Sequence, residues 1–125
     1  MAISEPYCLG DVVVVPFPYS DRASEKRRPA LVVSNDNIHG LGYVWLAMIT
    51  SAGQDPLRFD HAIDDIAGAG LSSPSIVRPT KIACVEPSRI LRVAGRLAPE
   101  HVSQICAALR RFIGPQTVSA ERQSR

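Results

Sequence analysis

Two polar side chains stand where segments of the chain end, and both types can bind a phosphate group. Arg28 closes the charged segment 19–28 and precedes the apolar segment PALVVS at 29–34. A guanidinium stays protonated, and its planar fork matches two phosphate oxygens. Thr50 closes the apolar segment 43–50, and its hydroxyl can donate to a phosphate oxygen. Taken alone, Arg28 is more typical of a solvated loop, and Thr50 is as typical of a turn cap.

Further polar and aromatic side chains accompany these two. Lys26 and Arg27 come directly before Arg28; we expect them to steer phosphates, and Arg27 is a register alternative to Arg28. Ser51 adds a second hydroxyl donor. Tyr19 opens the charged segment and is a candidate to stack on an unpaired base. Trp45 also has that capacity, but apolar neighbours flank it, so we expect it in the core.

Candidates for moving a proton are weaker. Asp21 and Glu25 lie in the charged segment and could act as a base or orient Arg28, although such carboxylates are more often solvated. Imidazole titrates near neutrality, but the three histidines are scattered. His61 lies in a possible strand and is the one worth testing, whereas His101 is expected to be exposed on the polar side of a helix.

Composition argues against several other kinds of site. Cys8, Cys84 and Cys106 are far apart, odd in number and outside any C-x-x-C pair, so neither a disulfide framework nor a zinc site is expected. We expect no metal and no cofactor. The net charge of +2 and the pI of about 8.6 do not by themselves predict nucleic-acid binding. Neither a signal peptide nor an apolar run of the ~18 residues that a membrane span needs is recognisable, so a cytoplasmic protein is expected.

The pattern of apolar residues predicts the elements that would position these side chains. Strands are expected at 11–15, 29–34, 43–50 and 58–63, and shorter ones in SIVRP, KIACVE and RILRVAGRL. Loops are expected at 19–28, 50–57 and 64–74. A helix at 99–113 follows from its apolar residues, which share one face: Val102, Ile105, Cys106, Leu109, Phe112 and Ile113. The result is a mainly β fold, a small bent antiparallel barrel with a C-terminal helix, with one domain at 1–114 and a flexible polar tail at 115–125.

Four blocks resemble the MazF/PemK family of toxins in order and spacing. They are GDVVVVPFPYSDRASEKRRPALVVS at 10–34, LAMITS at 46–51, PSIVRPTKIACVEPSRI at 74–90 and GRLAPEHVSQICAALRRFIG at 95–114. The resemblance implies an SH3-like barrel, a homodimer, and an antitoxin partner whose disordered tail folds across the RNA groove. It also implies metal-independent cleavage of single-stranded RNA, in which the 2′-hydroxyl attacks and leaves 2′,3′-cyclic phosphate and 5′-hydroxyl ends.

The resemblance also assigns roles to individual residues. The family's catalytic arginine falls on Arg28 and its active threonine on Thr50. Arg78 matches an arginine that some members use in catalysis, but the acid that those members carry two residues later is replaced by Thr80. We therefore expect Arg78, like Lys81, to bind RNA. The loop histidine of some members has no counterpart in 19–28.

Two other functions remain open at this stage. A toxin of the related CcdB type shares the barrel but binds DNA gyrase and performs no phosphate chemistry. A degenerate relative would bind RNA without cutting it, and its binding would weaken with salt.

Overall fold

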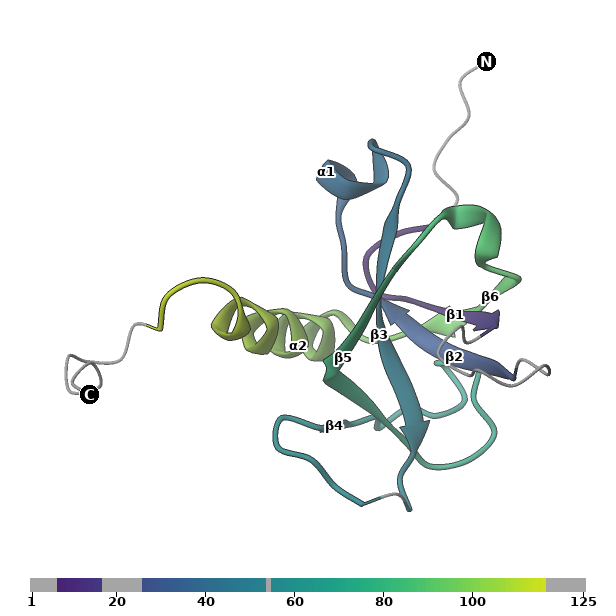
Figure 1. Ribbon diagram of the computed structural model, residues 1–125. Helices are drawn as coiled ribbons and strands as arrows, with labels where there is room; N and C mark the ends of the chain where they lie inside the picture. Colours follow the sequence, from purple (N-terminus) through teal and green to yellow (C-terminus); the bar gives the residue numbers. More distant parts are fainter. Residues whose placement is uncertain (1–6, 17–25, 54, 117–125) are drawn as a thin grey trace.

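The computed structural model describes residues 7–16, 26–53 and 55–116. In chain order it contains β1 (Asp11–Pro16), β2 (Arg27–Val32), α1 (Asp36–His39), β3 (Val44–Ser51), β4 (His61–Ala62), β5 (Ser75–Val85), a 3₁₀ turn η1 (Pro87–Arg89), β6 (Arg92–Arg96) and α2 (Pro99–Phe112) (Figure 1). The predicted sites Tyr19, Asp21 and Glu25, and tail residues 117–125, lie outside the described part of the chain.

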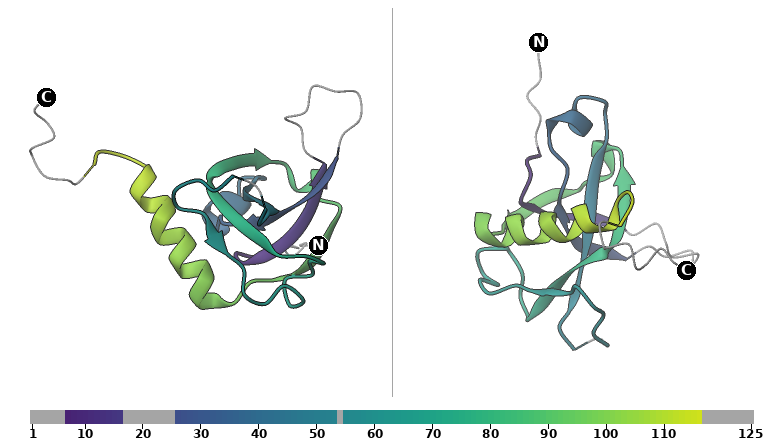
Figure 2. Two further views of the ribbon diagram at one scale, coloured as in Figure 1. Left: turned by 90° about the horizontal axis from the view of Figure 1, so that it is seen from below. Right: turned by 90° about the vertical axis from the view of Figure 1, so that its left-hand side faces the viewer.

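The strands form one sheet that curls into a half-barrel (Figure 2). Its order is β4-β5-β3-β2-β1-β6, and each pair of neighbours is antiparallel. β1 therefore lies between β2 and β6, which brings the first and last strands of the chain together. The predicted mainly β fold, a small bent barrel with a C-terminal helix, is confirmed.

Residues on both faces of the central strands β1, β2 and β3 are buried, which explains why these strands are nearly continuously apolar. Successive residues of β1 point to opposite faces, so Val12 and Val13 belong to two different clusters, and both are fully buried. The first cluster joins Val12 and Leu31 to Val102 and Ile105 of α2. That packing fixes α2 beside the half-barrel (Figure 2).

α2 begins and ends close to where its sequence predicts. Pro99 occupies the first turn, where its missing N–H costs nothing. The helix ends at Phe112, and Gly114 follows with a φ of +89°. Among the described residues, no helix is long and apolar enough to cross a membrane.

The expected strand at 58–63 is wrong except for His61–Ala62. Asp60 folds back on the chain here, because its carboxylate accepts a hydrogen bond of 2.8 Å from the Leu57 amide. Phe59 adopts a φ of +77°, which is incompatible with a strand. Residues 57–60 therefore form a turn, in which Asp60 pairs with Arg78 of β5 and the Phe59 ring packs edge to face on Phe112 of α2.

The start of β2 also differs from the prediction. The strand begins at Arg27, so Arg27 and Arg28 belong to it rather than to the loop 19–28. β1 lies alongside and pairs Val15 with Arg28 and Pro16 with Arg27. Both arginines are thus mounted on hydrogen-bonded backbone.

Two more sequence interpretations need correction. SIVRP and KIACVE form the single strand β5, whose pairing with β3 jumps from Arg78 to Ile82 and leaves Pro79–Lys81 as an irregularity. Trp45 is 37% exposed rather than in the core. Its neighbours Val44 and Leu46 point inward, so the alternation of the strand turns Trp45 to the outer face.

Candidate functional site

A cleft of about 780 Å³ opens where β2 and β3 separate. The hydrogen-bonded pairing of the two strands ends at Ala30 and Met48. The next residue of β2 is Pro29, which has no N–H to donate to a neighbouring strand. Continuing the same register by two residues brings Arg28 level with Thr50, so the strand geometry explains why these side chains share a cleft.

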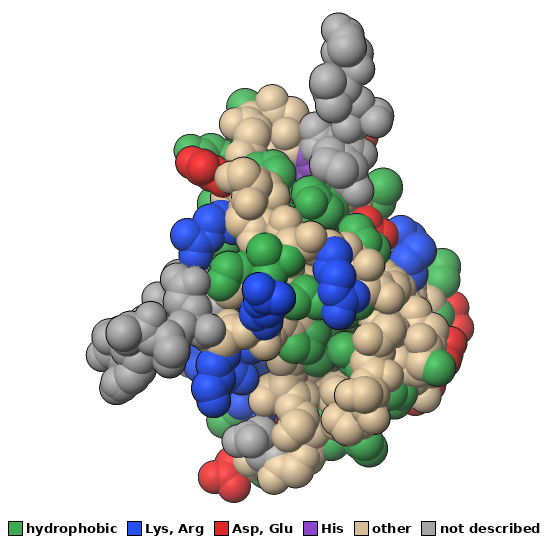
Figure 3. Space-filling model, turned by 90° about the vertical axis from the view of Figure 1, so that its right-hand side faces the viewer, with side chains coloured by type: hydrophobic (Ala, Val, Ile, Leu, Met, Phe, Trp, Pro, Cys, Tyr) green, Lys and Arg blue, Asp and Glu red, His purple; other side chains and the backbone are tan. Residues whose placement is uncertain are grey.

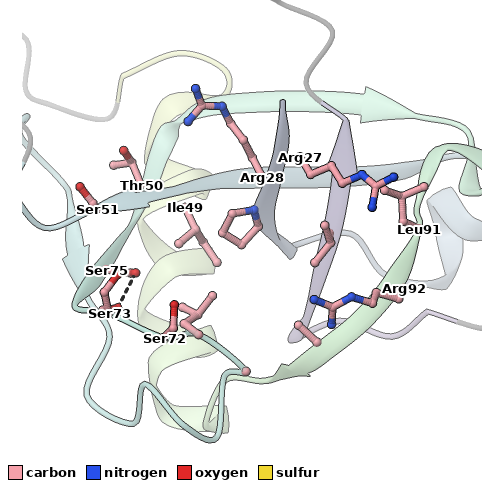
Figure 4. A pocket seen from close by; sticks show the side chains of 15 residues that line it. Arg27, Arg28, Ile49, Thr50, Ser51, Ser72, Ser73, Ser75, Leu91 and Arg92 are labelled. Carbon is pink, nitrogen blue, oxygen red and sulfur yellow. Dashed lines mark hydrogen bonds between the residues drawn. The ribbon is translucent and has the colours of Figure 1, made fainter. Parts of the chain in front are cut away.

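The cleft has an apolar floor and a polar rim (Figure 4). Its floor consists of partly or fully buried residues from four strands and one loop: Val14, Pro29, Ile49, Leu71 and Ala94. Three arginines stand on the rim, namely Arg27, Arg28 and Arg92, and all are exposed. On the face shown in Figure 3, Lys and Arg side chains surround a patch of hydrophobic ones.

Four of the predicted site residues line this cleft together: Arg27, Arg28, Thr50 and Ser51. In Figure 4 the Arg28 guanidinium lies at the same end of the cleft as the Thr50 and Ser51 hydroxyls. A guanidinium beside two hydroxyls can neutralise and hydrogen-bond the oxygens of a phosphate. Lys26 is exposed and directly precedes β2.

Arg92 and the serines in the wall opposite it were not predicted from the sequence. Arg92 sits in β6, and Ser72, Ser73 and Ser75 lie in or next to the segment that leads into β5. The Ser75 hydroxyl donates to the Ser73 carbonyl at 2.9 Å. The signal that could have found Arg92 is the pairing of β6 with β1, which local pattern does not reveal.

Arg78 lies outside the residues that line the cleft and is engaged elsewhere. Its Nε and Nη2 donate to the two carboxylate oxygens of Asp60 at 3.0 and 2.9 Å, and Nη2 also donates to the Asp55 carbonyl at 2.9 Å. The Arg78 side chain is 14% exposed. Its hydrogen bonds hold the pKa of Asp60 below the ordinary value. Asp60, in the loop between β3 and β4, thus gives Arg78 the carboxylate partner that Thr80 cannot provide. Lys81 also lies outside the cleft lining.

His61 is placed away from the cleft as well. Its Nε2 lies 2.8 Å from Nδ1 of His101, whose Nε2 lies 3.1 Å from the Asp64 carboxylate. Burial, followed by the nearby charge of His101, lowers the pKa of His61. The expectation that His101 is exposed is wrong, since its side chain is 20% exposed. These residues connect α2 to β4.

No group of three or more His, Cys, Asp or Glu side chains is arranged to hold a metal ion in residues 7–16, 26–53 and 55–116. The polar side chains that line the cleft offer guanidinium and hydroxyl groups.

Comparison with known proteins identifies the class to which this fold and cleft belong. Residues 9–113 match the family model described as "PemK-like, MazF-like toxin of type II toxin-antitoxin system". The chain belongs to this PemK/MazF toxin family. A comparison with curated protein sequences finds no match.

Solved structures of low sequence identity share the fold. The Mycobacterium tuberculosis toxin MazF-mt6 is 21% identical, with a TM-score of 0.63 over 79% of this chain and 91% of that one. MazF in a MazE–MazF complex from Deinococcus radiodurans is 20% identical, with a TM-score of 0.67 over 85% and 94%. An endoribonuclease from a mycobacterial species is 15% identical, with a TM-score of 0.68 over 94% and 100%.

Proposed function

We propose that this chain is a toxin that cuts single-stranded RNA without a metal ion. The observation that carries the proposal is the meeting of Arg28, Thr50 and Ser51 at one end of an open cleft with an apolar floor. A phosphate would lie among these polar groups, and an unpaired base can cover the floor. The family membership and the fold shared with an endoribonuclease support the same activity.

RNA supplies its own nucleophile, so the protein has three tasks. It must help to remove the proton from the 2′-oxygen, stabilise charge on the five-coordinate phosphate and protonate the 5′-oxygen that leaves. The bond from the 2′-oxygen to phosphorus forms as the bond to the 5′-oxygen breaks, which gives a 2′,3′-cyclic phosphate and a 5′-hydroxyl. Arg28 stabilises the charge, while Thr50 and Ser51 hold the phosphate oxygens in place.

We choose among the candidates for proton transfer by where they lie in the sequence or in the fold. His61 is turned toward His101, away from the cleft lining, so we do not assign it a role in cleavage. Asp21 and Glu25 belong to the segment that leads into Arg27 and Arg28, and we propose one of them as the base. Arg27, with Lys26, attracts the RNA backbone by charge.

We also propose two protein partners, which meet the chain in the cytoplasm. The MazE–MazF complex among the structural neighbours suggests a cognate antitoxin, which we place over the arginine-rimmed cleft. A second copy of the chain would cover a separate apolar groove of about 510 Å³ between α2, β3 and β5. Its exposed hydrophobic side chains are Leu9, Trp45, Ile82, Phe112 and Ile113.

The proposal is tested by incubating the purified protein with a long single-stranded RNA in the presence of EDTA and mapping the ends. We expect internal cuts with cyclic phosphate and 5′-hydroxyl termini. Intact RNA together with inhibited gyrase would instead favour the CcdB-like function. RNA that is bound but never cut would identify an inactive relative.

A further inference from the structure

The end of the cleft away from Thr50 carries a second set of polar groups, which the cleavage chemistry does not use. Arg92 stands on β6, and Figure 4 shows its side chain extending into the cleft on the side opposite Thr50 and Ser51. Ser72 and Ser73 stand across from it on the segment before β5. Between the two ends lies the apolar floor.

Arg92 is available to a ligand, unlike Arg78 and Arg96. Arg78 is held by Asp60, and Arg96 of the same strand is held by Asp11. Within the described part of the chain, no hydrogen bond or ion pair engages the Arg92 guanidinium. Its fork of donors is therefore free to meet two acceptors at once.

The register of β6 against β1 places Arg92 at the cleft. Arg92 pairs with Val14, which also lines the cleft. The pairing shifts between Val12, which faces Gly95, and Val13, which faces Val93, so Ala94 is an extra residue and β6 carries a bulge there. Arg92 and Ala94, two residues apart, lie on the same side of β6, and both line the cleft.

The wall of the cleft that carries Ser72 and Ser73 packs closely against β6, the strand of Arg92. The Arg96 amide donates to the Gly68 carbonyl at 3.1 Å. Gly70 has a φ of +77°, and a Cβ on it would lie 2.1 Å from the Ala94 carbonyl oxygen. A Cβ on Gly95 would lie 2.4 Å from the Gly68 carbonyl oxygen. Since backbone packs on backbone here, the spacing between Arg92 and the serines is set before any ligand binds, which lowers the cost of binding.

The floor between these walls fits a nucleobase better than a second phosphate. A phosphate placed over Val14, Pro29 and Ile49 would lose water without gaining polar contacts. A base has two apolar faces and a polar edge, so it can lie on the floor and present that edge to Arg92. Unpaired bases are read in this way, by contact with their faces and hydrogen bonds to their edges.

We propose that Arg92 and Ser72 form a base-reading subsite beside the cleavage site, selective for guanine or cytosine. Arginine binds two adjacent acceptors, as O6 and N7 of guanine provide, and O2 and N3 of cytosine offer the same pattern. Adenine places its amino donor beside the acceptors N1 and N7, and uracil places the N3 donor between its two carbonyl acceptors. The Ser72 hydroxyl can donate or accept and completes the contact with the edge. This inference rests on the proposed RNA cleavage.

The test maps the cut sites in an RNA library of randomised sequence for the wild type, Arg92→Gln and Arg89→Gln. Arg89 is exposed on η1, outside the cleft lining, and controls for the loss of one positive charge. We expect the wild type to prefer G or C at one position next to the cut. Arg92→Gln should reduce that preference roughly tenfold and favour adenine, because a glutamine side chain pairs with an acceptor and a donor.

The possible outcomes distinguish the proposed RNA cleavage from the proposed base-reading subsite. A wild-type protein that leaves RNA intact would overturn the proposed function and the subsite with it. A wild type that cuts with no G or C preference would overturn the subsite alone. The same holds if Arg92→Gln lowers the cleavage of all sequences evenly, which would identify Arg92 as a phosphate contact. Ser72→Ala, a second variant at an exposed position, should also weaken the preference.

Discussion

At the scale of single residues, the cleft contains groups that are poor catalysts in water and become effective only when the fold positions them together. The Thr50 hydroxyl is a weak acid, and the Arg28 guanidinium is a cation that water would otherwise solvate. Placed at one end of the same cleft, they can stabilise charge that develops on a phosphate, since oriented donors act strongly where water is excluded.

Replacing Thr50 with valine removes the hydroxyl and keeps the shape of the side chain. We expect single-turnover RNA cleavage to slow by roughly 10-fold to 100-fold, because a hydrogen bond to a charged group contributes about 1.5–3 kcal/mol. Thr50→Ser should retain most of the rate. A Thr50→Val protein that cuts RNA as fast as the wild type would show that this hydroxyl does not contact the reacting phosphate.

The Arg78–Asp60 pair should contribute to stability in a manner that depends on pH. Arg78 lowers the pKa of Asp60 in the folded state, so the contribution is present above the unfolded value of about 3.9 and is lost as pH falls through the folded pKa. Asp60→Asn should destabilise the protein at neutral pH. The gap from the wild type in urea unfolding should be constant above about pH 5 and should narrow as pH falls from there through the folded pKa. A constant gap across that range would contradict the assigned role of the ion pair.

At the scale of elements, the strands and the C-terminal helix were predictable because their apolar residues repeat locally. Periodicity located α2 within one residue of its end at Phe112. The strand predicted at 58–63 was wrong for a different reason. The turn at 57–60 is held by Arg78, which lies 18 residues from Asp60 in sequence, and local pattern contains no trace of that contact.

The cleft was predictable in part, and not from local pattern alone. Arg28 and Thr50 each stand at the junction of a charged or polar segment with an apolar one, but it was the resemblance to the MazF/PemK family that assigned them a role. Arg92 could not be named, because its place in the cleft depends on the pairing of β6 with β1. Register of this kind is set by distant parts of the chain.

Gly70 connects the wall of the cleft to β6, so its replacement should affect both stability and shape. Gly70→Ala would require φ of +77° and a Cβ 2.1 Å from the Ala94 carbonyl oxygen. We expect a loss of about 1 kcal/mol or more in the free energy of unfolding, measured in urea. Gly53→Ala is the matched control, since a Cβ there meets nothing within 4 Å. Equal stability of both variants would show that the segment 68–75 is free to move away from β6.

At the scale of the whole molecule, two surfaces separate two proposed tasks. We propose that the arginine-rimmed cleft binds RNA and the antitoxin, and that the apolar groove beside α2 binds a second copy. Trp45→Lys should shift the protein toward the monomer in light scattering, because it places a charge on the apolar groove. Leu57→Lys, at another exposed apolar position outside the groove, should leave the mass unchanged. An unaltered mass for Trp45→Lys would remove this groove as the interface.

The central claim is that Arg28 stabilises the phosphate while the RNA is being cut. The most direct measurement is the single-turnover cleavage rate of Arg28→Ala in EDTA, with Arg89→Ala as a control for charge and with folding checked by thermal unfolding. We expect the folded Arg28→Ala protein to lose roughly 10²–10³ in rate and Arg89→Ala to cut normally. A folded Arg28→Ala protein that cuts RNA at the wild-type rate would contradict the claim.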